Sequence, residues 1–396
     1  MTMTAVYVVD ACRTPIGKAK GQLAGVRPDD LTAVVMRALL ARTPSLDPSR
    51  IDDVYWGAAN QAGEDNRNAA RMGVLLAGLP LEVPGATVNR LCASGLEAVS
   101  GAARAIAAGE ADLCLAGGTE SMTRAPFVLP RPDSGYPRSM ELADTRLGWR
   151  LVNPQMQKDY PPISLGETAE NVADRYGIGR ERQDAFALTS HQRATAAAAA
   201  GRFTTEVLPV AVKNGEATAD EGPDASVTLE ALGTRKPAFR REGTVTGGNS
   251  SPLSDGAAGL LLTSERGLAA LGVEPLARYV GTAAAGVHPD FMGIGPVPAT
   301  RKLLARIGWS VDDLDLVELN EAFAAQSLAV VDELKLDPER VNVNGGAIAL
   351  GHPLGCSGAR LAGTLAHEMR LKGVRRGLVS LCIGVGQGLS MALEAA

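Results

Sequence analysis

Cys92 stands at the start of a run of small residues, in the stretch 88–98 (VNRLCASGLEA). A thiol at the N-terminus of a helix lies in the partial positive charge of the helix dipole, which stabilises the thiolate. The pattern therefore fits a nucleophile whose pKa is lowered below the usual value of about 8.5. A packing cysteine fits the same residues, because free cysteines commonly behave as small buried apolar side chains. This stretch alone leaves both interpretations open.

His352 is one of four histidines in the chain and lies in the glycine-rich stretch 344–360 (NGGAIALGHPLGCSGAR). A role in core packing is a poor explanation for a histidine between Gly351 and Pro353. An imidazole in such a turn could remove a proton from a thiol or donate a hydrogen bond to an oxyanion. The alternative is a histidine that is bonded to nearby backbone groups.

Cys382 closes an apolar strand pattern in the stretch 380–388 (SLCIGVGQG) and is followed by Gly384, Gly386 and Gly388. Free backbone N–H groups in such a turn could form an oxyanion hole. A nucleotide-binding glycine loop is disfavoured, because no basic residue lies in the stretch and no lysine follows it.

Asn320 and Glu321 stand at the end of a predicted strand, just before an apolar helix, in the stretch 318–328 (ELNEAFAAQSL). Asn320 could cap that helix, since asparagine is a favoured N-cap residue. It could equally take part in chemistry, and the local sequence does not decide between the two.

The elements that must position these residues alternate between strand and helix patterns. The predicted strands of the first part cover residues 5–15, 51–60, 85–91 and 111–121. The predicted helices cover residues 29–43, 68–80 and 94–110. Such alternation predicts an α/β fold with a largely parallel sheet.

The alternation of strand and helix patterns is interrupted between residues 122 and 251, where a segment rich in proline and arginine is followed by helical patterns. The α/β pattern then returns. The stretches 92–95 (CASG) and 355–358 (GCSG) each open a helix of small residues, and each helix is followed by an apolar strand that ends in glycines. This weak repeat predicts two copies of one α/β unit.

Composition excludes several classes of protein. The formal net charge of −5 is spread over 396 residues and creates no basic field for nucleic acid. No apolar stretch approaches the ~20 residues that span a bilayer, and the N-terminus has no signal-peptide pattern. Five cysteines without paired spacing favour neither disulfides nor a zinc site. We therefore expect reduced thiols in a cytoplasmic protein, with no metal, nucleic acid or membrane partner.

Taken together, the four motifs resemble those of the thiolase family, in the same order and over nearly the whole chain. The resemblance implies that Cys92 is the acyl-carrying nucleophile, that His352 activates it, and that Cys382 moves a proton to or from the α-carbon or the leaving thiol. It implies one oxyanion hole formed by His352 and a water held by Asn320. The backbone N–H groups of Cys92 and Gly384 would form the other.

The fold that the resemblance implies has two similar βαβαβαββ halves in a five-layer α-β-α-β-α arrangement. The N-terminal half would comprise residues 1–121 and 252–274, and the C-terminal half residues 275–396. Residues 122–251 would form a loop domain over the coenzyme A site. Thiolases are dimers or tetramers, and we expect a homotetramer.

No tightly bound cofactor is implied, and coenzyme A would be the co-substrate. Ser251 matches a position that contacts pantetheine. Arg235, together with Lys236, Arg240 and Arg241, supplies local positive charge that could meet the CoA phosphates.

The activity implied is the reversible thiolysis of a 3-ketoacyl-CoA to acetyl-CoA and a shortened acyl-CoA, through an acyl-enzyme and with ping-pong kinetics. Two departures bear on the substrate. Many thiolases have glycine where this chain has Val385, and a His-Met-Gly stretch where it has Ser164, Leu165 and Gly166. These departures argue against a short acetoacetyl specificity.

Three other stretches are similar to the 3-oxoadipyl-CoA thiolases of aromatic catabolism; they cover residues 59–72, 147–156 and 383–388. A substrate with a distal carboxylate needs a cationic or hydrogen-bonding partner. Arg67, Arg146 and Arg150 are candidates, although most arginines are simply solvated.

The main alternative is a general 3-ketoacyl-CoA thiolase of β-oxidation or an acetoacetyl-CoA thiolase. A decarboxylating condensing enzyme is disfavoured by the second cysteine, Cys382. A non-catalytic acyl-CoA or lipid-binding relative is disfavoured by the presence of all four motifs.

Overall fold

The computed structural model describes residues 4–132 and 134–396. Residues 1–3 of the predicted N-terminal half and residue 133 of the predicted loop domain lie outside the described residues. No helix in the described part of the chain is both long enough and apolar enough to cross a membrane.

The N-terminal half forms one five-stranded region of sheet. Its strands are β1 (Val6–Arg13), β3 (Asp53–Gly57), β4 (Ala86–Val88), β5 (Leu113–Ser121) and β10 (Ser254–Ser264). They lie in the order β4-β3-β5-β10-β1, with β4, β3 and β5 parallel and β10 antiparallel to both neighbours. The short strand β2 (Gly17–Lys18) pairs with β10. Every residue of β5 and β10 is buried, as expected for central strands covered on both faces.

The C-terminal half repeats this arrangement. Its strands are β11 (Ala277–Gly286), β12 (Leu316–Leu319), β13 (Arg376–Ile383) and β14 (Gln387–Glu394). They lie in the order β12-β13-β14-β11, with β12 parallel to β13 and the remaining pairs antiparallel. Val341 forms a parallel bridge to Val317 of β12, in the place that β4 takes beside β3. The shared strand order confirms the repeat that the sequence predicted.

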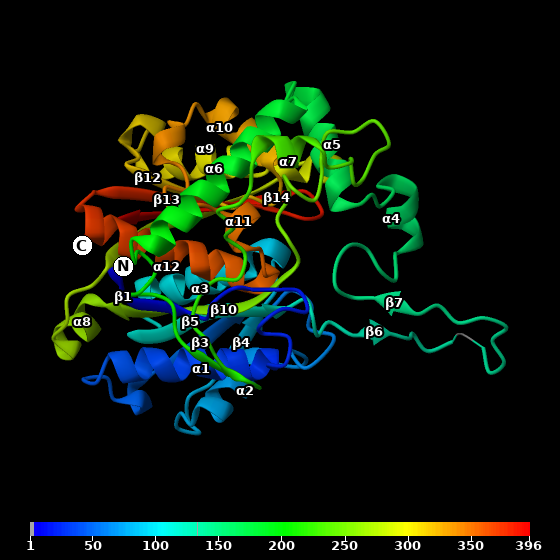
Figure 1. Ribbon diagram of the computed structural model, residues 1–396. Coiled ribbons are helices and arrows are strands. Elements are labelled where there is room, and N and C mark those ends of the chain that lie inside the picture. The colour runs from blue at the N-terminus through cyan, green and yellow to red at the C-terminus, as the bar shows by residue number, and fades with distance from the viewer. Residues whose placement is uncertain (1–3, 133) are drawn as a thin grey trace.

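Helices cover and separate the two sheet regions in five layers (Figure 1). The outer helices are α1 (Pro28–Arg42) and α2 (Ala69–Ala77) on one side, and α9 (Pro296–Ile307) and α10 (Ala324–Leu334) on the other. The central layer holds α3 (Ser94–Ala108) and α12 (Leu354–Lys372), which pack against each other and against β5. The two sheet regions meet at one edge, where Val6–Val8 of β1 pair with Ala277–Tyr279 of β11. The fold is therefore the predicted α-β-α-β-α arrangement.

Glycines let the two central helices approach closely. A Cβ atom added at Gly95 would lie 2.7 Å from the carbonyl oxygen of Gly355, and one added at Gly358 would lie 2.3 Å from the backbone nitrogen of Leu96. Larger residues at either position would push the N-terminal ends of α3 and α12 apart. The two small-residue stretches noted in the sequence are thus the contact between the halves.

The segment between β5 and β10 contains most of the remaining elements. They are β6 (Phe127–Val128), β7 (Ala143–Asp144), α4 (Pro154–Asp159), α5 (Leu165–Tyr176), α6 (Arg180–Ala199), β8 (Val210–Val212), β9 (Gly215–Ala217) and α7 (Leu229–Gly233). Two short helices elsewhere are α8 (Glu265–Leu271) and α11 (Ala347–Leu350). Short 3-10 segments are η1 (Pro48–Arg50), η2 (Leu91–Ala93), η3 (Pro289–Ile294), η4 (Val311–Asp313) and η5 (Pro338–Arg340). Helix α5 packs against η3 and α10, and α6 packs against α10 and α11. The division into three domains stays a prediction.

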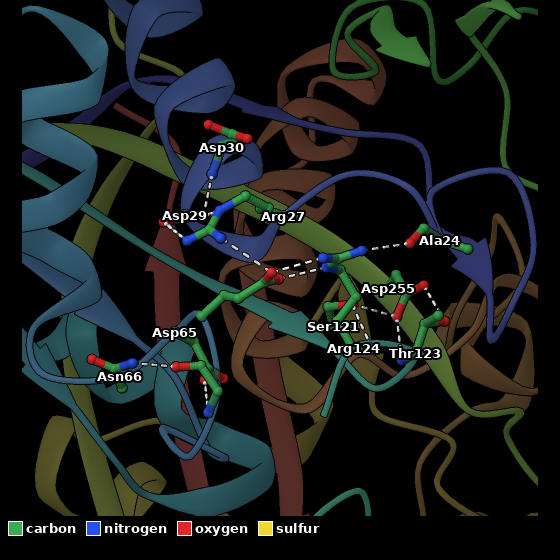
Figure 2. Close-up of polar contacts among 12 residues, drawn as sticks. Ala24, Arg27, Asp29, Asp30, Asp65, Asn66, Ser121, Thr123, Arg124 and Asp255 are labelled. Carbon is green, nitrogen blue, oxygen red and sulfur yellow. Dashed lines mark hydrogen bonds and ion pairs between the residues drawn. The ribbon is translucent and has the colours of Figure 1, made fainter. Parts of the chain in front are cut away.

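An ionic cluster fixes the loop that follows β3 (Figure 2). Glu64 in this loop accepts from Arg27 at 3.1 Å and from Arg124 at 2.5 Å. Arg27 also pairs with Asp29 in the first turn of α1. Asp65 accepts from the backbone N–H of Gly63. The loop is thereby held between α1 and the chain leaving β5, with its first residues facing the site described next.

Candidate active site

Cys92 lies in the 3-10 turn η2, two residues before α3 begins. Ser94 holds this turn, because its Oγ accepts from the backbone N–H of Arg90 at 2.9 Å and donates to the carbonyl of Leu91 at 2.7 Å. Leu91 has a φ of +46°, a left-handed conformation that costs a non-glycine residue on the order of 1–3 kcal/mol. The strained Leu91 makes the turn between strand and helix tight, directly before the Cys92 side chain.

The Cys92 thiol is protonated at neutral pH in the free protein. Burial raises its pKa to about 11, although the backbone N–H groups of Gly384 and of Cys92 itself act in the opposite direction. The prediction of a lowered pKa is therefore wrong for the unliganded site. Loss of solvation outweighs the local dipoles, and this balance could not be judged from a helix start alone.

His352 lies between α11 and α12 and is 5% exposed. The preceding Gly351 has a φ of +107°, and a Cβ atom there would lie 2.4 Å from Ser254 Oγ. The same Ser254 Oγ accepts from the His352 backbone N–H at 3.2 Å. Glycine is thus required at position 351 both by its backbone conformation and by its close contact with β10.

The hydrogen bonds of the His352 ring determine which nitrogen carries the proton. Ser357 Oγ lies 2.6 Å from Nδ1 and donates its own hydrogen to the Pro353 carbonyl at 2.9 Å. Ser357 must therefore accept from Nδ1–H, which leaves the lone pair on Nε2. Burial and the charge of Arg360 lower the pKa of His352 to about 3, so the ring is neutral. Its Nε2 is therefore the ring nitrogen that can accept a hydrogen bond or a proton.

Asn320 follows β12 directly, and its backbone N–H donates to the Ser380 carbonyl of β13 at 2.9 Å. Its Nδ2 lies 3.3 Å from His352 Nε2. Helix α10 begins only at Ala324, with no side-chain cap, so the capping interpretation of Asn320 is wrong. Asn320 Oδ1 is buried and has no hydrogen-bond partner among the described residues. The oxygen is therefore available to a water or ligand beside the imidazole.

Cys382 is buried near the end of β13 and packs with side chains of α5, of η3 and of the segment before α10. Burial, followed by the charge of Cys92, raises the pKa of the Cys382 thiol. The Cys92 thiolate would act on Cys382 in this way because β13 packs against η2. The other cysteines, Cys12, Cys114 and Cys356, are free and buried in apolar cores, where they pack as small apolar side chains.

A pocket of about 430 Å³ opens beside Cys92. Gly384 lines it, as do Val385 and Leu165, the latter from the stretch 164–166, where the sequence departs from many thiolases. Val385 has a φ of +66°, which is strained for a β-branched residue. The two departures, which lie far apart in the sequence, therefore change the wall of one pocket.

Two of the three candidate arginines line this pocket, namely Arg146 and Arg150, whereas Arg67 is exposed and does not. Arg146 is bound to both carboxylate oxygens of Asp144 at 2.5–3.1 Å. Arg150 has no ion pair with any described carboxylate. These different environments separate two residues that the sequence could not tell apart.

The residues expected to contact CoA lie outside the pocket. Ser251 Oγ donates to the Ala322 carbonyl at 3.1 Å. Arg235 is exposed and passes over Gly248, and Lys236 beside it is exposed as well. Arg240 is already paired with Glu167 and Asp174, so it is a poor candidate for a phosphate contact.

Two further residues belong to the site and were not singled out in the sequence. One is Ser357, whose signal is its place one turn into the helix after His352. The other is Glu120, which lines the pocket at the end of β5 and accepts from the backbone N–H groups of Ala59, Asn60 and Gly355 at 2.8–3.1 Å. Burial raises the Glu120 pKa to about 7. The sequence signal that could have identified Glu120 is an acidic residue within an apolar, glycine-rich strand.

Comparison with known proteins identifies the family. Residues 6–266 match the model of the thiolase N-terminal domain, and residues 273–395 match that of the thiolase C-terminal domain. The chain belongs to the thiolase family. It is accordingly an acyltransferase.

Relatives and solved structures cover this thiolase over its whole length. It is 54% identical to a Pseudomonas putida protein named beta-ketoadipyl-CoA thiolase, over 99% of this chain and 100% of that protein. It is 53% identical to an Escherichia coli K12 protein named 3-oxoadipyl-CoA/3-oxo-5,6-dehydrosuberyl-CoA thiolase, with the same coverage. The crystal structure of the Bacillus anthracis acetyl-CoA acetyltransferase superposes with a TM-score of 0.93 at 42% identity, over 100% of both chains.

Proposed function

We propose that this thiolase cleaves 3-oxoadipyl-CoA with CoA, giving acetyl-CoA and a shortened dicarboxylic acyl-CoA. The observation that carries the proposal is 54% identity over nearly the whole chain to a protein named beta-ketoadipyl-CoA thiolase. Support comes from the pocket beside Cys92, where the wall is altered at Leu165 and Val385 and an arginine is present.

The proposed reaction begins when the Cys92 sulfur attacks the 3-keto carbon of the substrate. The bond between the α-carbon and the keto carbon then breaks, and its electron pair goes to the enolate of acetyl-CoA. Protonation of that enolate carbon releases acetyl-CoA. A second CoA thiol attacks the thioester on Cys92, transfers the acyl group and regenerates the free enzyme.

Proton transfer from Cys92 accompanies the attack in this proposal. Burial raises the pKa of Cys92 to about 11 and lowers the pKa of His352 to about 3, so both groups are neutral in the free enzyme at neutral pH. A thiolate–imidazolium pair is therefore not a resting state. We infer that the proton moves to His352 Nε2 as the sulfur–carbon bond forms and the oxyanion takes up the negative charge.

Two groups of donors would stabilise that charge. The backbone N–H groups of Cys92 and Gly384 both act on the Cys92 sulfur, so they are close enough to serve an acyl oxygen attached to it. Once it has taken the Cys92 proton, His352 could donate its Nε2–H in the second hole, together with a water that donates one hydrogen to Asn320 Oδ1. Cys382 would deliver or remove the proton at the α-carbon.

Coenzyme A is the co-substrate in this proposal, with Ser251 and Arg235 as its contacts. No group of three or more potential metal-ligand side chains is found among the described residues. Assembly as a homotetramer and location in the cytoplasm stay predictions.

The test of the substrate is a comparison of kcat/KM for 3-oxoadipyl-CoA and acetoacetyl-CoA in the same buffer. The proposal expects a preference of at least tenfold for 3-oxoadipyl-CoA. A preference for acetoacetyl-CoA would overturn it in favour of the short-chain alternative. A folded protein that turns over neither compound would instead support the non-catalytic relative.

A further inference from the structure

The pocket beside Cys92 combines apolar walls with an arginine. Its apolar lining is contributed by Leu91, Leu147, Trp149, Leu151, Leu165, Leu354 and Val385. A carboxylate that entered such a pocket without a partner would lose its hydration, which is strongly unfavourable. An acyl chain that ends in a carboxylate therefore needs a cation at this wall.

Only two of the residues that line the pocket are basic, Arg146 and Arg150. The guanidinium of Arg146 is occupied by Asp144, which contacts it through both carboxylate oxygens. The only acidic residue in the lining, Glu120, is turned toward three backbone N–H groups. Neither Asp144 nor Glu120 is paired with Arg150. Within the described part of the chain, Arg150 is the cation of this pocket whose donors are not committed to a carboxylate.

The backbone around Arg150 has the marks of a constrained turn. Gly148 has a φ of +80° and Leu151 a φ of +49°, so left-handed residues stand on either side. Asn153 then caps α4 by accepting from the backbone N–H groups of Gln155 and Met156. A left-handed leucine costs on the order of 1–3 kcal/mol, and such strain tends to cluster at ligand sites. The turn keeps Arg150 half-buried at the pocket wall instead of leaving it in bulk solvent.

We propose that Arg150 is a specificity-determining residue, whose guanidinium binds the distal carboxylate of a 3-oxodicarboxylic acyl-CoA. The inference rests on the proposed function. A guanidinium offers paired N–H donors that match both oxygens of a carboxylate, and partial burial strengthens this contact. The apolar lining accommodates the methylene groups between that carboxylate and the reacting carbon. Chains without the carboxylate gain nothing from Arg150.

The test compares 3-oxoadipyl-CoA with 3-oxohexanoyl-CoA, which has the same chain length and a terminal methyl group. In Arg150→Ala, kcat/KM for 3-oxoadipyl-CoA should fall by roughly 10- to 100-fold, mainly through KM, which is the range for a charge-assisted hydrogen bond. Activity on 3-oxohexanoyl-CoA should stay within about threefold, which also shows that the variant folds. Arg150→Lys should recover only part of the loss, because the paired geometry is missing.

Arg67→Ala is the matched control, since it removes an exposed arginine outside the pocket and should alter neither substrate. An equal loss on both substrates in Arg150→Ala would overturn the inference, as would a larger selective loss in Arg146→Ala. If the wild type prefers 3-oxoadipyl-CoA and Arg150→Ala keeps that preference, the inference fails while the proposed function stands. If the wild type shows no preference between the two compounds, the proposed function fails as well.

Discussion

Replacing Ser357 by alanine should shift the proton on the His352 ring. In the wild type, Ser357 Oγ accepts from Nδ1–H at 2.6 Å in a buried site, so the lone pair resides on Nε2. Without this acceptor the Nδ1–H would be buried and unpaired. The unpaired donor is avoided if the ring proton moves to Nε2 and the Asn320 amide turns its Oδ1 toward the ring to accept it. Asn320 Oδ1 is available because it has no other partner in the described structure. The new tautomer cannot accept the Cys92 proton.

The size of the effect follows from the lost bond. Leaving a buried donor unpaired costs about 1–3 kcal/mol. The balance between the two tautomers therefore shifts by roughly 5- to 150-fold. The value of kcat for thiolysis should fall by up to that factor while the protein stays folded. The same shift should appear in the ¹⁵N NMR spectrum of the ring, where Nδ1 loses and Nε2 gains the proton-bearing character.

The matched control is Ser100→Ala in α3. Ser100 is also a buried helical serine, but its Oγ has no hydrogen-bond partner among the described residues, so its loss should change kcat less than twofold. If Ser357→Ala keeps wild-type kcat and the wild-type ¹⁵N pattern, Ser357 does not set the tautomer, and the derivation of Nε2 as the base is wrong.

Two further predictions concern stability. Val385 has a φ of +66°, so Val385→Gly removes about 1–2 kcal/mol of backbone strain and loses about 0.4–1 kcal/mol because the unfolded chain becomes more flexible. In denaturant unfolding, Val385→Gly should be at least as stable as the wild type and more stable than Val385→Ala. A more stable Val385→Ala variant would contradict the strain at this position. His352 has a folded pKa of about 3, below the unfolded value of about 6.5, so the unfolded chain binds more protons and stability is lost as pH falls from about 6.5 toward 3, by up to about 1.4 kcal/mol per pH unit. His352→Gln should flatten this part of the dependence in unfolding titrations at successive pH values, and parallel curves for the two proteins would refute the buried neutral imidazole.

The sequence predicted those parts of the site that are marked by local patterns. Cys92, His352 and Cys382 each stand where a strand ends or a helix begins, within a few residues of glycines. The repeated small-residue stretches predicted two similar halves, because each of two helices that contact each other through glycines must have small residues at the contact.

Properties that depend on distant segments could not be predicted in this way. The pKa of Cys92 is raised by burial under parts of the chain far away in sequence. The role of Asn320 depends on the pairing of β12 with β13, which carries it to His352 rather than to the start of α10. The three candidate arginines were equivalent in the sequence. The fold places one on the surface and two at the pocket, and one of those two is paired with Asp144.

The central claim is that Cys92 carries the acyl group, and intact-protein mass spectrometry after incubation with acetyl-CoA tests it most directly. Wild-type protein should gain one acetyl group per chain, located on the peptide that contains Cys92. Cys382→Ser should gain it too, because Cys382 acts on the α-carbon and not on the thioester. Cys92→Ser should gain none. Acetylation of Cys92→Ser at the wild-type level, or its absence from the wild type, would contradict the account.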